Sequence, residues 1–330
     1  MTANRIGKSN LAGTPSRRSS SCGLALLTLA FLAPSAARAD DLFWTDNDDS
    51  RIYRSALDGS NRQTVLSLGA GVDPRGIAID SLSGHLYWAE NGTNRIRRAN
   101  LDGTGAVTIV AANLAFPADV ELDLAAGKIY WADRDLDWIR RANLDGTGVE
   151  TVVNLPAAGN TTAPYFLELD PAGGKIYWSD FDSGIIHRAN LSDGSGIENV
   201  VTGLDRVRDI VLDAAAGKLY WNDRDTHLVQ RQNVGGGGRE TLYGPAGLVE
   251  PHGLVLHDAT NALFWADGEG RSIGSGGKNG GGPYATIANG AAPFHPWDID
   301  IALTPIPEPQ SIVLAGLGGS LLWRFTRRRR

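Results

Sequence analysis

Short stretches in which apolar and polar residues alternate recur between residues 41 and 302 of this 330-residue chain. The segments RGIAID, ADVELD and RDIVLD (75–80, 118–123 and 208–213) are examples. A period of two places successive side chains on opposite faces of an extended strand. Asp-Gly pairs follow many of these runs and favour tight hairpin turns, which need a positive φ. The pairs start at Asp58, Asp102, Asp145 and Asp193. No long stretch between them has a helical period, so the pattern predicts an all-β fold.

One aromatic motif returns six times within this pattern. The copies are LFWTD (42–46), LYWAE (86–90), IYWAD (129–133), IYWSD (176–180), LYWND (219–223) and LFWAD (263–267). Successive tryptophans of the motif are 43 to 47 residues apart. Four strands of about six residues with four short connections need roughly 44 residues, the length of one propeller blade. The period therefore predicts a six-bladed β-propeller.

The two ends of the repeat region indicate how the ring closes. A strand ends eight residues before the tryptophan of each later motif, at Asp80, Asp123, Asp170, Asp213 and His257. The first motif lacks such a strand, whereas the strand PWDIDIA at 296–302 has no motif after it. This C-terminal strand is predicted to be the inner strand of the first blade, which leaves the ring without open edges. The sixth repeat is Gly-rich over 272–287, so its outer strands are the least regular part of the pattern.

The motif and the turn after it resemble a known family. The Tyr-Trp-x-Asp boxes and the downstream Arg-Ala-x-Leu-Asp-Gly turns are similar to the YWTD, or LDL-receptor class B, repeats of six-bladed propellers, over about residues 41–302. Two boxes depart from the pattern, with Phe43 in the place of Tyr and Glu90 in the place of Asp. The chain holds no Cys-rich module of the kind that accompanies these repeats, so the resemblance implies the fold and not a receptor.

We interpret the repeated box as a structural unit. In KIYWSD (175–180), alternation places Trp178 and Asp180 on one face and Tyr177 on the other. Blades pack on both faces, so both aromatics are predicted to be buried. The acid at the strand end is predicted to accept backbone hydrogen bonds that link neighbouring blades. A catalytic group is seldom needed six times round a ring, so a site is expected where the repeats differ.

The inner strands should surround the central channel, and one position near their start varies between repeats. We predict a ligand-binding rim there, because aromatic and arginine side chains commonly anchor interfaces. Its residues are Arg75, Tyr165, Arg208, His252 and Trp297. Because His252, His295 and Trp297 belong to adjacent inner strands, these three side chains could also converge.

The following positions of the inner strands carry the carboxylates Asp119, Asp209, Asp298, Glu121, Glu168 and Asp300. They could hold Ca²⁺ in the channel, since this ion takes six to eight oxygen ligands. Lactonase-like six-bladed propellers keep a catalytic metal there. No Asp/Asn-rich ligand pattern stands out in this chain, and no serine nucleophile or phosphate loop is marked. The sequence therefore predicts no catalytic residue, no metal ligand and no cofactor.

The charge distribution narrows the range of partners. The formal net charge is −6, yet residues 1–39 and 304–330 hold ten of the 31 basic residues and only one of the 37 acidic residues. The region between them is strongly acidic, which argues against nucleic-acid binding because phosphates would be repelled. The single cysteine, Cys22, precedes this region, so the region can hold no disulfide and no thiolate metal site.

The N-terminal segment is typical of an export signal. Residues 1–39 combine a basic start, the apolar run GLALLTLAFL at 23–32 and a small-residue cleavage site. This order predicts a signal peptide that is removed between Ala39 and Asp40.

The C-terminal segment, 304–330, is typical of a sorting tail. Pro307, Glu308 and Pro309 precede a short apolar stretch and a cluster of arginines. This order resembles the PEP-CTERM signal of Gram-negative bacteria, which implies that an exosortase removes the tail at the membrane. A simple C-terminal anchor, with the arginines on the cytoplasmic side, is the alternative.

These features together predict an exported, non-enzymatic binding or scaffold propeller at residues 40–303. It would act in the cell envelope, on the outer surface or in the extracellular matrix of a Gram-negative-type bacterium. Its ligand would be a surface protein or a polysaccharide. The alternative is a metal-dependent hydrolase, lactonase or lyase that acts in the central channel, because a fold does not by itself decide a function.

Overall fold

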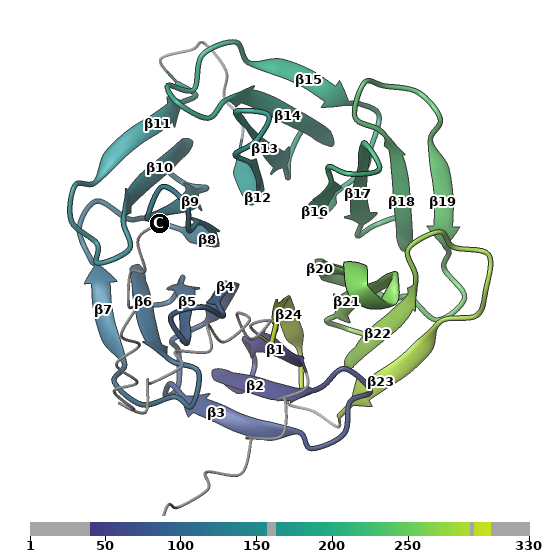
Figure 1. Cartoon of the computed structure of the whole chain (residues 1–330), viewed down its shortest axis with the longest axis horizontal. Coiled ribbons are helices and arrows are strands. Elements are labelled where there is room, and N and C mark those ends of the chain that lie inside the picture. The colour runs from purple at the N-terminus through teal and green to yellow at the C-terminus, as the bar shows by residue number, and fades with distance from the viewer. Residues whose placement is uncertain (1–39, 157–162, 291–293, 305–330) are drawn as a thin grey trace, which may run out of the picture. The chain divides into compact units, whose positions relative to one another are not determined.

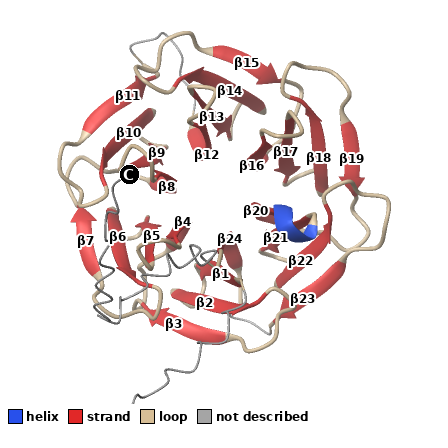
Figure 2. Ribbon diagram, in the orientation of Figure 1, coloured by secondary structure: helices blue, strands red, loops and turns tan. Residues whose placement is uncertain are grey.

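The computed structural model describes residues 40–156, 163–290 and 294–304. Within these ranges, 24 strands form six four-stranded antiparallel sheets, accompanied by one short 3₁₀ helix, η1 (Asp258–Thr260). The sheets stand as blades around a common axis (Figure 1), and strands dominate the whole domain (Figure 2). No helix of the described ranges is long and apolar enough to cross a membrane. The predicted all-β, six-bladed propeller is confirmed.

Each blade is built from four strands that run from the axis outwards. The inner strands are β4 (Pro74–Asp80), β8 (Pro117–Asp123), β12 (Pro164–Asp170), β16 (Val207–Asp213), β20 (Pro251–His257) and β24 (Pro296–Ala302). The second strands carry the aromatic box and are β1 (Asp41–Asp46), β5 (His85–Glu90), β9 (Lys128–Asp133), β13 (Lys175–Asp180), β17 (Lys218–Asp223) and β21 (Ala262–Asp267).

The third and outer strands complete the blades. The third strands are β2 (Arg51–Ala56), β6 (Arg95–Asn100), β10 (Trp138–Asn143), β14 (Ile185–Asn190), β18 (Leu228–Asn233) and β22 (Ser272–Gly277). The outer strands are β3 (Gln63–Ser67), β7 (Val107–Val110), β11 (Glu150–Asn154), β15 (Glu198–Val201), β19 (Glu240–Tyr243) and β23 (Ala285–Asn289). The Gly-rich sixth repeat therefore keeps both outer strands. A Cβ on its Gly274 would lie 2.3 Å from Nε1 of Trp265, so this glycine makes room for the indole ring.

The ring closes through its two chain ends, as the orphan strands predict. One sheet has the order β24-β1-β2-β3, so the last strand of the chain is the inner strand of the first blade. The pairing is antiparallel, with Leu42 opposite Ile301 and Asp41 opposite Ala302. Asp40, just before this blade, also accepts a 2.6 Å hydrogen bond from the backbone N–H of Thr304.

The two aromatics of each box hold neighbouring blades together. All six box tryptophans are at most 1% exposed. Within each apolar cluster, the box tryptophan of one blade packs with the box Tyr or Phe of the preceding blade. The six pairs are Phe43 with Trp88, Tyr87 with Trp131, Tyr130 with Trp178, Tyr177 with Trp221, Tyr220 with Trp265 and Phe264 with Trp44. The predicted burial on opposite faces is confirmed. The departure at Phe43 is accommodated because this ring meets only an apolar cluster.

The box acids fix the connections between blades. Asp133 accepts hydrogen bonds from the backbone N–H groups of Ala115 and Phe116, which lie between the outer strand of one blade and the inner strand of the next. The acids of four other boxes bind the corresponding connections; these acids are Asp46, Asp180, Asp223 and Asp267. The predicted structural role of the acid is therefore confirmed for these five blades.

Glu90, the acid of the second box, behaves differently. Its Oε1 accepts a 3.0 Å hydrogen bond from Nε1 of Trp88, and its Oε2 accepts a 2.6 Å bond from the hydroxyl of Thr93. The longer side chain folds back onto its own blade. In the other blades Nε1 is left without a hydrogen-bond partner at Trp44, Trp131, Trp178 and Trp221.

The predicted signal peptide with Ala39, and the predicted sorting motif at 307–309, lie outside the described residues. Export, processing and sorting therefore stay predictions.

Candidate functional site

The centre of the ring is a cavity of about 260 Å³ lined by carboxylates. The third and fifth residues of an inner strand face the axis because alternate side chains share a face. Seven acids line the cavity. Six are those expected from the sequence, Asp119, Glu121, Glu168, Asp209, Asp298 and Asp300, and the seventh is Asp258 of η1.

Four of these acids join neighbouring inner strands, and three of them, Asp119, Asp209 and Asp298, occupy the third position of their strands. The bonds run from Leu167 N to Asp119 Oδ2 (2.7 Å), from Leu254 N to Asp209 Oδ2 (2.6 Å) and from Ile77 N to Asp298 Oδ2 (2.8 Å). They occur at every second boundary between blades. At two of the intervening boundaries a glycine faces the aspartate, and a Cβ on Gly76 would lie 2.2 Å from Asp119 Oδ1. The channel therefore has an approximate three-fold pattern that the six-fold sequence repeat does not show.

Burial makes these acids weaker. Removal from water raises the pKa of Asp119 and of Asp300 to about 7, although backbone hydrogen bonds act in the opposite direction. Burial and then the charge of Glu168 raise the pKa of Glu121 well above its ordinary value of 4.5. A protonated carboxyl is a poor cation ligand, and several of these oxygens already accept backbone N–H groups. We therefore assign the six acids a structural role and do not assign Ca²⁺ to them.

The replacement Glu121→Gln is expected to stabilise the protein at pH 8 and to have little effect at pH 5. A raised folded-state pKa means that the folded protein holds the proton over a pH range in which the unfolded chain has released it. Stability is then lost as the pH rises from the unfolded to the folded pKa. Glutamine does not titrate, so the variant does not lose stability over this pH range. Since 1 kcal/mol corresponds to roughly 2–4 °C for a domain of this size, thermal unfolding at pH 8 should shift upwards by at least a few degrees.

Glu269→Gln is the matched control, because Glu269 is exposed. Its unfolding temperature should follow that of the unchanged protein at both pH values. Equal shifts for the two variants, or destabilisation by Glu121→Gln at pH 8, would show that the buried Glu121 does not lower the stability of the fold at this pH.

The five predicted rim residues do come together at one end of the channel, but they are not an exposed rim. Tyr165, Arg208, His252 and Trp297 are at most 5% exposed. The guanidinium of Arg75 lies 3.6 Å from the centre of the Trp297 ring, and the centre of the His252 ring lies 4.0 Å from the same centre. We call these five side chains the plug. The expectation of exposure was wrong because the inner strands converge at the axis, where the side chains cover one another; the role in ligand binding stays a prediction.

The plug contains cationic nitrogen atoms without partners. Nε and Nη1 of Arg208 make no hydrogen bond within the described residues, and this side chain is 4% exposed. The guanidinium instead lies 4.9 Å from the ring centre of Tyr165 and 4.6 Å from that of Phe181. Burial lowers the pKa of Arg208, although Tyr165 acts against this shift. A buried donor without an acceptor destabilises the structure. An anionic group bound near this end could accept hydrogen bonds from Arg208 and remove this cost.

Around the plug, each blade contributes two further residues, of which only His295 was foreseen from the sequence. One residue follows the box acid directly, and the other precedes the inner strand. A backbone hydrogen bond joins the two in every blade, at 2.9 to 3.4 Å. We call these twelve residues the collar: Asn47, Asp73, Asn91, Phe116, Arg134, Ala163, Phe181, Arg206, Arg224, Glu250, Gly268 and His295. The signal that could have found them is their variation at two fixed positions of an otherwise regular repeat.

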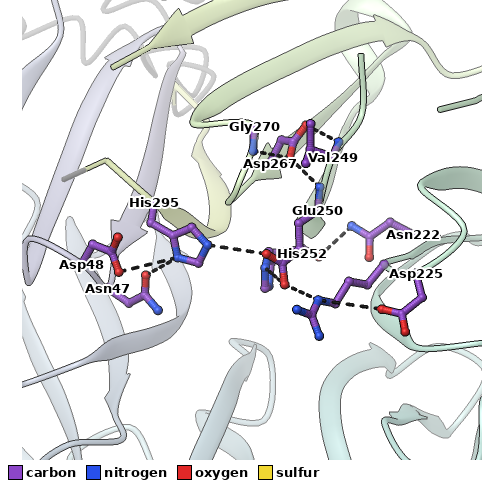
Figure 3. A network of polar contacts seen from close by, with 11 residues as sticks. Asn47, Asp48, Asn222, Asp225, Val249, Glu250, His252, Asp267, Gly270 and His295 are labelled. Carbon is purple, nitrogen blue, oxygen red and sulfur yellow. Dashed lines mark hydrogen bonds and ion pairs between the residues drawn. The ribbon is translucent and has the colours of Figure 1, made fainter. Parts of the chain in front are cut away.

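Two collar residues and one plug residue form a polar cluster between two neighbouring blades. Nε2 of His252 lies 3.4 Å from Glu250 Oε1, and Nε2 of His295 lies 3.9 Å from Glu250 Oε2. Figure 3 shows the three side chains facing one another, with Asn47 and Asp48 on the far side of His295. The predicted convergence of His252, His295 and Trp297 is confirmed. The two imidazole centres lie 5.5 Å apart, and the ring centre of Trp297 lies 4.0 Å from that of His252 and 6.1 Å from that of His295. Glu250 was not foreseen.

The backbone of this cluster is fixed by box acids. Asp267 accepts hydrogen bonds from the N–H groups of Val249 and Glu250, and Asp46 accepts one from the N–H of His295 at 3.0 Å. The repeated acids thus position variable side chains without contributing to the cluster themselves.

Comparison with known proteins supports this architecture. Residues 40–81 match the family described as low-density lipoprotein receptor repeat class B. No curated protein is similar to the chain at a significant level. Many solved structures share the fold. One is a chain of the nidogen/laminin complex, with 23% identity, a TM-score of 0.70 and coverage of 81% of this chain and 99% of that one.

Two further structures with this type of fold are lyases. Virginiamycin B lyase from Staphylococcus aureus is 17% identical, with a TM-score of 0.54 and coverage of 70% of this chain and 74% of that one. A streptogramin B lyase is 15% identical, with the same TM-score and coverage of 76% and 74%. At these identities the likeness concerns the fold alone. The chain is therefore a six-bladed β-propeller that carries a repeat of the low-density lipoprotein receptor class B type.

Proposed function

We propose that this propeller is a non-enzymatic binding protein that captures an anionic partner, a polysaccharide or an acidic surface of another protein, at the collar. The observation that carries the proposal is the gathering of arginines and aromatic rings at this end of a largely acidic domain. Arginine and aromatic side chains provide most of the energy at typical binding surfaces. Nidogen in complex with laminin has a similar fold, which is compatible with binding of a protein.

Arg134 and Arg206 are the collar arginines best placed for contact. Their side chains are 32% and 47% exposed. Both guanidiniums lie 5.4 Å from the ring centre of Phe181. Their ion pairs, with Asp135 at 4.0 Å and with Asp225 at 3.5 Å, are long and partly exposed. Such pairs contribute little, so both cations are available to a carboxylate or sulfate, which arginine can bind with two parallel hydrogen bonds.

Replacement of Arg134 and Arg206 by alanine together is expected to weaken binding of an anionic partner by at least about tenfold, since each charge-assisted hydrogen bond contributes roughly 1.5–3 kcal/mol. Isothermal titration of the purified protein with a polyuronate, and a binding screen against acidic surface proteins, measure the effect. Higher salt should weaken binding in the unchanged protein more than in the variant.

The matched control replaces Arg98 and Arg141, which belong to third strands on the side of the propeller. Binding should persist in this variant. Greater loss in the control than in the collar variant would place the partner on the side of the blades. The buried plug arginines, Arg75 and Arg208, are unsuitable for this test because their removal would also disturb packing.

The place of action that we propose is the bacterial cell surface or matrix, after export and exosortase processing. This rests on the predicted signals at residues 1–39 and 304–330. Mass spectrometry of the mature protein checks it, because Asp40 should be the first residue and residues beyond Pro309 should be missing. We do not propose hydrolase, lactonase or lyase activity in the channel, because its carboxylates bind the backbone of neighbouring blades.

A further inference from the structure

We propose that Glu250, His252 and His295 bind one divalent transition-metal ion of the Zn²⁺ type at the collar. The potential ligand atoms of these residues all lie within 4.8 Å of one another. This site is independent of the partner proposed above, because it rests only on the geometry of three side chains. Imidazole and carboxylate ligands together suit Zn²⁺.

The distances fit a metal of this size. With bonds of 2.0–2.1 Å, the ligand atoms of a tetrahedral zinc site lie roughly 3.3 Å apart. The carboxylate of Glu250 lies 3.4 Å from Nε2 of His252 and 3.9 Å from Nε2 of His295. The two distances involve different oxygens, Oε1 and Oε2, and the three ligand atoms lie within 4.8 Å of one another. Shifts of up to about 1 Å per side chain would therefore complete three coordination positions. The fourth position would remain open to water or to an anionic ligand.

The ring nitrogens of His252 are free to bind a ligand within the described structure. The side chain is fully buried, yet neither ring nitrogen has a hydrogen-bond partner. The ring is held in place by Trp297, 4.0 Å away, and the backbone by Asn222, which donates to the carbonyl oxygen of His252 at 2.6 Å.

His295 is oriented as a ligand. Its Nδ1 lies 2.6 Å from the amide oxygen of Asn47, which can only accept, so Nδ1 carries the proton. The lone pair is then on Nε2, which faces Glu250 and has no hydrogen-bond partner. Metal-binding histidines usually donate their other ring N–H in this way, because the bond fixes the tautomer and the direction of the ring.

A glycine lets the two imidazoles approach the backbone at the cluster. Gly268 occupies the collar position after the box acid, where four of the other blades carry Asn or Arg and one carries Phe. A Cβ on Gly268 would lie 2.4 Å from Nε2 of His295 and 3.0 Å from Cδ2 of His252. Its φ is not in the left-handed region, so the backbone conformation does not require glycine. The absence of a side chain is therefore explained by the two histidine rings, which occupy the place that a Cβ would take.

One cation and two further carboxylates surround the cluster. Arg224 pairs through Nε with Oε1 of Glu250 and leaves Oε2 towards His295. Asp225 contacts Arg224 at 4.0 Å, and Asp48 lies 4.0 Å from Nδ1 of His295. The three carboxylates balance the charges of Arg224 and of a divalent ion, so a water molecule suits the fourth position.

The test is equilibrium dialysis of the full chain, stripped with a chelator, against ZnCl₂. One Zn²⁺ per chain is expected, together with a rise in the thermal unfolding temperature and, with Co²⁺, a visible absorption band of tetrahedral type. His295→Gln should weaken the affinity for Zn²⁺ by at least about 100-fold, since loss of groups that merely orient ligands costs 10–100-fold. Asn47→Ala should weaken it by about 10–100-fold.

Two further variants make the outcome decisive. Gly268→Ala keeps all three ligands, but its methyl group would displace the His295 ring, so it should also abolish stoichiometric binding. His85→Gln removes a histidine at the start of β5, far along the chain from the cluster, and should bind Zn²⁺ like the unchanged protein. The proposal is overturned if the unchanged protein binds no stoichiometric Zn²⁺ at micromolar concentration, or if His295→Gln and Gly268→Ala still bind it as His85→Gln does.

Discussion

Deletion of residues 294–303 is expected to destroy the folded ring. This segment contains β24, whose loss exposes the paired edge of β1. It also removes four buried apolar side chains, Phe294, Trp297, Ile299 and Ile301. Full burial of such a side chain contributes about 1.5–3 kcal/mol. The loss is therefore comparable with the whole stability of a typical domain, about 5–15 kcal/mol.

The deletion also removes the hydrogen bonds that join the first and the second blade. Asp298 and Asp300 accept them from the backbone N–H groups of Ile77 and Ile79 at 2.8 and 2.7 Å. Size-exclusion chromatography should detect aggregation, since open strand edges pair with other chains. A chain that stops after Thr304 keeps β24 and is the matched control. A deletion variant that stays monomeric and melts with this control would refute closure through β24.

Trp178→Ala is expected to lower the free energy of unfolding by about 3–5 kcal/mol, the usual loss for a buried aromatic. Trp178 is fully buried and stacks on His187 at 5.3 Å between ring centres. It also packs with Tyr130 of the preceding blade, so its removal loosens a boundary between two blades. Chemical denaturation monitored by far-UV circular dichroism measures the change.

Trp138→Ala is the control for this prediction, because Trp138 lies at the start of β10 and is only partly buried. Its loss should be less than half that of Trp178→Ala. Equal losses would contradict the structural role of the box tryptophan. Trp297, which belongs to the predicted ligand-binding rim, gives a further comparison. Since Trp297 is 5% exposed and packs on Arg75 and His252, we expect Trp297→Ala to cause a loss close to that of Trp178→Ala.

The site could be predicted from the sequence only in part. Variation between repeats indicated the residues that meet at one end of the channel, and the sequence named His252, His295 and Trp297. It missed Glu250 and the other collar residues, because those positions lie in short connections, where alternation gives no direction for a side chain. It also could not show that Arg208 would be buried, because burial at the axis depends on how closely six strands converge.

The sequence by itself determined the strands, the number of blades, the closing strand and the burial of the box aromatics. All of these follow from local alternation and a regular period, which act within one blade or between consecutive blades. Only the tertiary structure decided which variable side chains meet. His252 and His295 are 43 residues apart and belong to different blades, and the ring brings their Nε2 atoms to opposite oxygens of Glu250. Such a meeting depends on the curvature of the closed ring, which no local pattern encodes.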